Sequence, residues 1–200
     1  MVQALIQPEH PVAKPPLRHW RAWADPDTAS RWLSQLQRET PWKQEAITLF
    51  GKRHPLPRLT CWMADPGCGY RYSGLQNTIE QWSATAQLIR EQVNKASGWN
   101  FNSLLLNWYR DGKDAMGFHA DDEAELDPQA PIASLSLGAS RTLRFKPKRG
   151  VQGESTSLEL GHGDLLLMDP PTQELWLHGL PRRLRVAQPR LNLTFRVVSR

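Results

Sequence analysis

Two histidines and an aspartate have the types and spacing to bind a metal ion. His119 and Asp121 are separated by one residue, and His178 follows near the end of a predicted strand. In an extended segment residues i and i+2 point to the same side, so His119 and Asp121 can offer an imidazole and a carboxylate to one ion. With His178 as third ligand they would occupy one face of an octahedral ion and leave the other open, as in non-haem Fe(II) oxygenases.

Each of these residues also has an ordinary interpretation. His-x-Asp is a common tripeptide, and the acidic run from Asp121 to Glu125 fits a solvated surface turn as well. A single histidine such as His178 more often packs in the protein or faces solvent than binds a metal. These three residues taken alone therefore leave both interpretations open.

A pair of arginines on the predicted C-terminal strand could bind an anion. Arg190 and Arg196 are six residues apart and share one face with Asn192 and Thr194. A guanidinium group binds a carboxylate in bidentate fashion, and an arginine in a β core needs an anion or partner to neutralise it. The same spacing fits an outward pair on an edge strand. A fold with an internal ligand cavity would place this polar face inside.

Two helices are predicted before these residues. Asp25-Pro26 is typical of a helix start, and Ala29, Trp32 and Leu36 follow at helical spacing. A second helix is predicted over residues 77–97, where apolar residues mark one face and the following glycine acts as a C-terminal cap. The first 20 residues contain four prolines and little periodicity, which predicts an extended N-terminal arm before a single domain over residues 21–200.

Beyond residue 98 the apolar spacing changes from helical to alternating. A run of short strands separated by Gly, Pro and charged turns favours a sandwich, a barrel or a jelly roll. The predicted strands are 104–109, 132–137, 142–145, 156–160, 165–168, 175–178 and 191–198.

Composition excludes several classes of protein. The 200 residues suffice for one domain with a sizeable core, and the apolar runs are far shorter than the ~18 residues that span a bilayer. No signal peptide is evident, so we expect a protein without membrane contact in the cytoplasm, or in the nucleus of a eukaryotic cell. The net charge of +5 is concentrated in residues 141–200, where 11 Lys and Arg face 5 Asp and Glu. A basic surface of this kind is compatible with binding nucleic acid.

Several motifs occur together in one order along the chain. Asn107-Trp-Tyr109, His119-x-Asp121, His178 and the strand from Asn192 to Arg196 together resemble the AlkB family of oxidative dealkylases, over roughly residues 45–198. The resemblance is closest to the AlkB homologues that act on duplex DNA. The motifs that carry this closer resemblance are Phe50-Gly51-Lys52, Pro57-Arg58, Tyr70-x-Tyr72-Ser73-Gly74, His119-x-Asp121-Asp122-Glu123 and Pro131-Ile132-Ala133-Ser134.

The resemblance implies a mainly β member of the α+β class, with a double-stranded β-helix (jelly-roll) core at about residues 100–198 buttressed by N-terminal helices. It implies that His119, Asp121 and His178 hold Fe(II), and that 2-oxoglutarate and O2 are cosubstrates. The 2-oxoglutarate ligands would include Arg196 on the distal carboxylate. The full implied set is Asn107, Tyr109, Arg190, Asn192 and Arg196.

The implied reaction is repair of N-alkylated bases of the 1-methyladenine and 3-methylcytosine type in DNA. The base is flipped out of the duplex, the alkyl carbon is hydroxylated, and an aldehyde is released while 2-oxoglutarate becomes succinate and CO2. RNA demethylation and protein hydroxylation on the same core remain alternatives, and so does a non-catalytic cupin-like binding module. We expect the protein to be a monomer.

The resemblance also implies substrate contacts, mainly in a nucleotide-recognition region at about residues 45–75. Phe50 would fill the gap left by the flipped base, although a buried core position is its ordinary alternative. Aromatic residues would stack on the base, carboxylates would border a cationic lesion, and a basic loop would touch phosphates unless it is simply solvated. The implied contacts are Phe50, Lys52, Arg58, Tyr70, Tyr72, Ser73, Asp122, Glu123, Arg183 and Arg185.

Overall fold

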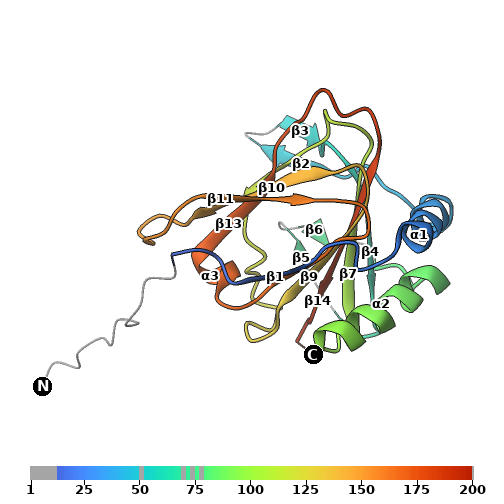
Figure 1. Cartoon of the computed structure of the whole chain (residues 1–200), viewed down its shortest axis with the longest axis horizontal. Coiled ribbons are helices and arrows are strands. Elements are labelled where there is room, and N and C mark those ends of the chain that lie inside the picture. Colours follow the sequence, from blue (N-terminus) through green and yellow to red (C-terminus); the bar gives the residue numbers. More distant parts are fainter. Residues whose placement is uncertain (1–12, 50–51, 69–70, 73–74, 77–78, 200) are drawn as a thin grey trace, which may run out of the picture.

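The computed structural model describes residues 13–199, apart from 50–51, 69–70, 73–74 and 77–78. Within these residues the strands form a six-stranded and a four-stranded antiparallel sheet (Figure 1). The larger sheet has the order β1 (Leu17–Trp20), β12 (Leu165–Met168), β9 (Ile132–Gly138), β14 (Arg190–Arg196), β7 (Ser103–Tyr109) and β4 (Leu59–Ala64). The smaller sheet has the order β11 (Thr156–Leu160), β10 (Arg141–Pro147), β13 (Trp176–Leu180) and β8 (Met116–His119). The predicted jelly-roll core is confirmed.

Two short hairpins stand beside these sheets. They are β2 (Ala46–Leu49) with β3 (Lys52–Pro55), and β5 (Arg71–Tyr72) with β6 (Leu75–Gln76). Figure 1 shows β2 and β3 at the opposite end of the molecule from the C-terminus. Both hairpins lie in the region expected to recognise nucleotides.

The helices α1 (Pro26–Glu39) and α2 (Ala84–Ser97) lie together against one face of the larger sheet (Figure 1). Asp25 caps α1 by accepting hydrogen bonds from two backbone N–H groups of its first turn. Trp32 and Leu36 of α1 and Ile89 and Val93 of α2 are buried against apolar side chains of the central strands. Burial of this face stabilises the domain and fixes the position of the sheet. No helix in the described part of the chain is both long and apolar enough to span a membrane.

Strand β14 is buried along its whole length, on both of its faces. Leu191, Leu193 and Phe195 point toward the helices and belong to the apolar core there. The intervening residues, from Arg190 to Arg196, point toward the smaller sheet. A second apolar cluster, which includes Phe145 and residues of both sheets, packs between the two sheets. The larger sheet therefore has one apolar face toward the helices and one mixed face toward its partner sheet.

The structure differs from the sequence predictions at several element boundaries. Helix α2 begins at Ala84 because the Ser83 hydroxyl accepts a hydrogen bond from the Ala86 N–H, so the predicted start at residue 77 is wrong. Residues 17–20, predicted within the extended arm, form the edge strand β1 and pair with β12. Strand β8 and the short helix α3 (Thr172–Leu175) were not predicted. The strands predicted at 156–160 and 165–168 have those bounds.

Candidate metal and cosubstrate site

The three predicted metal ligands meet between the two sheets. His119 ends β8, Asp121 follows it outside any strand, and His178 lies opposite His119 in the register of β13 with β8. One ligand atom from each residue lies within 4.8 Å of the others. The ring centroids of the two histidines are 4.3 Å apart, and Nε2 of His119 is 3.8 Å from Oδ1 of Asp121.

The surroundings of both histidines suit metal binding by neutral imidazoles. Nδ1 of His119 lies 2.9 Å from the carbonyl oxygen of Gly117. If Nδ1 carries the proton and donates to that oxygen, Nε2 is left with its lone pair for a metal. Burial lowers the pKa of His178 to about 3, so this ring is neutral at physiological pH. Nδ1 of His178 is buried and has no hydrogen-bond partner among the described residues.

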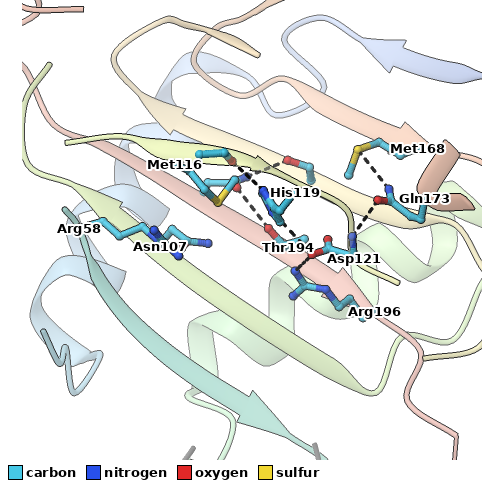
Figure 2. A network of polar contacts seen from close by, with 12 residues as sticks. Arg58, Asn107, Met116, His119, Asp121, Met168, Gln173, Thr194 and Arg196 are labelled. Atoms are coloured by element: carbon cyan, nitrogen blue, oxygen red, sulfur yellow. Dashed lines mark hydrogen bonds and ion pairs between the residues drawn. The ribbon is translucent and has the colours of Figure 1, made fainter. Parts of the chain in front are cut away.

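The carboxylate of Asp121 is ionised although it is buried. Burial alone would raise its pKa, but the positive charge of Arg196 and the hydrogen bond from that side chain outweigh burial and lower the pKa below its usual range. Nη2 of Arg196 lies 2.9 Å from Oδ1 of Asp121, as the dashed line in Figure 2 shows. The site therefore has an ionised carboxylate oxygen beside the neutral imidazole of His178.

A band of polar side chains extends from this cluster across the inner face of the larger sheet. The direct cross-strand partners Tyr109 and Arg190, and Ser134 and Thr194, share this face. A narrow cavity of about 20 Å³ lies against the band and the metal ligands. The residues lining it are Tyr109, Met116, His119, Asp121, Ser134, Leu143, Met168, His178, Leu180, Arg190, Asn192, Thr194 and Arg196.

The two arginines occupy opposite ends of this band. Arg196 contacts the metal ligand Asp121, whereas Arg190 donates to the Ser136 hydroxyl at 2.9 Å and lies over the ring of Tyr109 at 5.5 Å. Burial lowers the pKa of Arg190 to about 10, and its Nε has no hydrogen-bond partner among the described residues. A dicarboxylate that chelates the metal would thus direct its far carboxylate to Arg190. Arg196, expected on the distal carboxylate, instead pairs with Asp121 at the metal end, so the position of Arg190 fits that carboxylate better.

Arg58, expected to contact the DNA substrate, is buried inside the protein. Only 4% of it is exposed, and its Nε donates to Oδ1 of Asn107 at 2.7 Å. Figure 2 shows the two side chains meeting away from the metal ligands, with Asn107 on β7 and Arg58 just before the neighbouring strand β4. Because Nε of Arg58 can only donate, the Asn107 oxygen must face it and the Asn107 NH2 group must point elsewhere. Arg58 therefore sets the orientation of an amide expected to bind 2-oxoglutarate.

A larger pocket of about 540 Å³ adjoins the metal ligands. It shares Asp121 and Met168 with the cavity, and the predicted substrate residues Asp122 and Glu123 line it. Asp122 is largely exposed and forms an ion pair with Lys148 at 2.6 Å. This pocket gives a bulky substrate an approach to the metal that is bordered by negative charge.

The remaining predicted substrate contacts lie in the loop between β13 and β14, in two hairpin strands or beyond the described residues. Arg183 and Arg185 are exposed in the loop between β13 and β14, where the Arg183 N–H donates to the Gly112 carbonyl oxygen. Lys52 and Tyr72 lie in the strands β3 and β5. Phe50, Tyr70 and Ser73 fall outside the described residues.

Sequence reasoning missed several residues of the site. Ser134 and Ser136 complete the polar face beside Thr194, whose place on that face was predicted, and their alternation with apolar neighbours in β9 was a usable signal. Gln173 of α3 contacts the backbone of Asp121, and no sequence pattern indicates that contact. Arg141 is buried and donates to the carbonyl oxygens of Asp111, Asp114 and Pro181, which fixes loops at one end of the cavity.

The donor set fits an Fe(II) ion with a 2-oxo acid cosubstrate. Two imidazoles and one carboxylate form the facial set that leaves positions open on non-haem iron. The buried, partner-free Nε of Arg190, at the end of a polar band that starts at the metal ligands, fits the second carboxylate of a dicarboxylic acid.

Comparison with known proteins agrees with this geometry. The family model described as the 2OG-Fe(II) oxygenase superfamily matches residues 16–196. Mouse DNA oxidative demethylase ALKBH2 is 44% identical over 158 residues, which cover 76% of this chain and 66% of that protein. Mouse alpha-ketoglutarate-dependent dioxygenase alkB homolog 3 is 40% identical over 176 residues, which cover 83% of this chain and 60% of that protein. The chain thus spans less than two thirds of the length of these relatives.

A solved structure supports the fold. The structure of OsALKBH1 superimposes with a TM-score of 0.63 at 18% identity, covering 92% of this chain and 97% of that one.

Proposed function

The chain belongs to the 2OG-Fe(II) oxygenase superfamily and, within it, to the AlkB family, and we propose that it is an Fe(II)- and 2-oxoglutarate-dependent demethylase of N-alkylated DNA bases. The observation that carries the proposal is the meeting of three features. The facial ligand set lies at one end of a polar cavity and at the edge of a second pocket bordered by carboxylates. The similarity to mouse ALKBH2, a DNA oxidative demethylase, supports DNA as the substrate.

The chain's own residues bind and orient the reactants. His119, Asp121 and His178 hold the metal, and Arg196 keeps the carboxylate ligand ionised. Arg190 pairs with the distal carboxylate of 2-oxoglutarate, which leaves the 2-oxo acid end directed at the metal. Bound Fe(II) supplies O2-dependent oxidation of an unreactive carbon coupled to decarboxylation of 2-oxoglutarate, chemistry that no amino-acid side chain provides.

The second pocket is suited to an alkylated base. Methylation at N1 of adenine or N3 of cytosine gives the base a positive charge, and Asp122 and Glu123 at the pocket favour a cation over a neutral base. Apolar side chains that include Leu126, Ile132 and Met168 line the same pocket and can contact the flat faces of a flipped-out base. We expect flipping to cost a few kcal/mol and to be easiest for a damaged base pair.

One turnover assay tests the proposal and its alternatives together. The protein is incubated with Fe(II), 2-oxoglutarate and O2, and with 1-methyladenine or 3-methylcytosine in single-stranded DNA, duplex DNA or RNA, or with a methylated peptide. Repaired base and succinate are measured separately. We expect repair of DNA with stoichiometric succinate, and loss of both in His119→Ala, Asp121→Ala and His178→Ala.

Other outcomes distinguish the alternatives. Faster turnover of RNA or peptide than of either form of DNA would replace the proposed substrate and keep the proposed chemistry. Absence of succinate with every substrate, in protein that binds Mn(II), would indicate a binding module and contradict the proposal. Full activity in one of the three alanine variants would remove that residue from the metal ligands.

A further inference from the structure

Asp121 is the metal ligand that the sheets hold least directly. Strand β8 ends at His119, so the backbone of Asp121 has no place in the strand pairing that fixes the two histidines. Its N–H instead donates to Oε1 of Gln173 at 3.0 Å. Figure 2 shows this hydrogen bond, which runs from the short helix α3 to the loop that carries Asp121.

Gln173 is itself held in one orientation. Its Nε2 donates to Sδ of Met168 at 3.6 Å, so the two ends of the amide have different partners. Because the Asp121 N–H can only donate, the oxygen of Gln173 must be the end that faces it. Two hydrogen bonds fix the start of α3. The Thr172 N–H donates to the Asp169 carbonyl oxygen, and the Thr172 hydroxyl donates to the Pro16 carbonyl oxygen.

The position of Gln173 in the chain gives this contact its importance. Gln173 precedes His178 by five residues, and the segment between them leads directly into β13. One side-chain amide therefore ties the segment that carries His119 and Asp121 to the segment that carries His178. Gln173 also lines the pocket proposed for the substrate, next to Asp121.

We propose that Gln173 is a positioning residue that fixes the metal ligand Asp121 by accepting the hydrogen bond of its backbone N–H. Outer residues that orient metal ligands typically contribute about 10–100-fold to metal affinity. Without the amide oxygen, the half-buried loop keeps an unpaired N–H and Asp121 gains freedom to rotate away from the metal. The inference rests on the proposed metal site but not on the identity of the substrate.

Metal affinity measured without turnover tests the inference. Mn(II) is titrated into the metal-free full-length chain, and free Mn(II) is followed by electron paramagnetic resonance. We expect Gln173→Leu, which keeps the volume and removes the acceptor, to weaken Mn(II) binding by about 10–100-fold. Gln173→Asn, which keeps the amide but shortens its reach, should weaken binding as well. Gln173→Glu keeps the acceptor oxygen and should retain clearly more Mn(II) affinity than Gln173→Leu or Gln173→Asn.

A matched control separates positioning from a general loss of structure. Gln44→Leu makes the same substitution and removes an amide hydrogen bond to the Leu56 carbonyl oxygen, far along the chain from the metal ligands. It should leave Mn(II) affinity unchanged, and the melting temperatures of the metal-free variants show whether each one folds. Should Gln173→Leu fail to fold, Gln173→Asn and Gln173→Glu still give different expectations.

The outcomes separate this inference from the proposed function. Wild-type Mn(II) affinity in Gln173→Leu or in folded Gln173→Asn would overturn the role of Gln173, and so would equal losses in Gln173→Glu and Gln173→Leu. Failure of the wild-type protein to bind Mn(II) at all would instead contradict the metal site and with it the proposed function.

Discussion

The two faces of the six-stranded sheet are built from the same strands and are almost equally buried, yet one face is apolar and the other is mixed. Toward the helices, Leu191, Leu193 and Phe195 of β14 lie in a continuous apolar core. Toward the smaller sheet, the alternate residues of the same strand are polar or charged, and Arg190 and Arg196 are each 2% exposed. Burial of the first face stabilises the fold, whereas burial of the second costs free energy unless a ligand compensates.

The difference shows how one strand divides stability and function between its faces. The apolar face needs no partner beyond the protein, since packing alone satisfies it. The cavity face carries guanidinium groups whose charge is disfavoured by burial, as the lowered pKa of Arg190 indicates. A dicarboxylic cosubstrate would supply the missing charge, so ligand binding and stability should be coupled on this face only.

The largest effect is expected on the helix-facing side. Leu193→Ala leaves a cavity in the apolar core and should lower the free energy of unfolding by about 2–5 kcal/mol, measured by urea denaturation. The affinity of the folded variant for 2-oxoglutarate should be that of the wild type. A loss of affinity as large as the loss of stability would show that the two faces are not independent.

The second largest effect is expected on the stabilisation of the protein by its cosubstrate, which depends on the cavity face and not on the apolar core. Arg190→Met replaces a buried charged side chain with an apolar one of similar length. The unliganded variant should therefore be at least as stable as the wild type. With Mn(II) present, 2-oxoglutarate at one hundred times its wild-type dissociation constant should stabilise the wild type by about 2.7 kcal/mol and the variant by nothing measurable. Equal stabilisation of both proteins in denaturant titrations would remove Arg190 from the cosubstrate site.

A smaller effect is expected where the cavity face meets the nucleotide-recognition region. Arg58→Met removes the donor that orients Asn107 and should weaken 2-oxoglutarate binding by about 1.5 kcal/mol, roughly tenfold. Isothermal titration with 2-oxoglutarate measures this loss, and a DNA-binding assay without 2-oxoglutarate serves as control. If the variant instead loses only DNA affinity, Arg58 contacts the substrate directly.

The smallest effect comes from a single hydroxyl on the cavity face. Thr194 donates through Oγ1 to Oδ1 of Asn192 at 3.2 Å, and Thr194→Val removes this bond while keeping the shape of the side chain. We expect a change of about 0.5–1.5 kcal/mol in 2-oxoglutarate affinity and little change in the urea midpoint. A loss of stability as large as that of Leu193→Ala would mean that Thr194 serves packing.

The sequence predicted the features that depend on local order. Short strand-like runs between turn residues located β11 and β12 to the residue, and the spacing of His119 and Asp121 with His178 predicted a metal site whose members the structure brings together. The predictions were wrong where a specific hydrogen bond, rather than residue spacing, sets the end of an element. Helical spacing extended α2 back to residue 77, but the Ser83 cap starts the helix at Ala84. The monomeric state and the cellular location stay predictions.

By itself the sequence determined which residues could bind iron and a carboxylate, because residue type and the two-residue period of a strand are local properties. It left open whether Arg190 and Arg196 face inward, which of them lies at the metal, and what holds Asp121 and Asn107. The tertiary structure decided these points, since the partners Gln173 and Arg58 come from segments far away along the chain. A hydrogen bond between distant segments depends on how the sheets pack, and no local pattern records it.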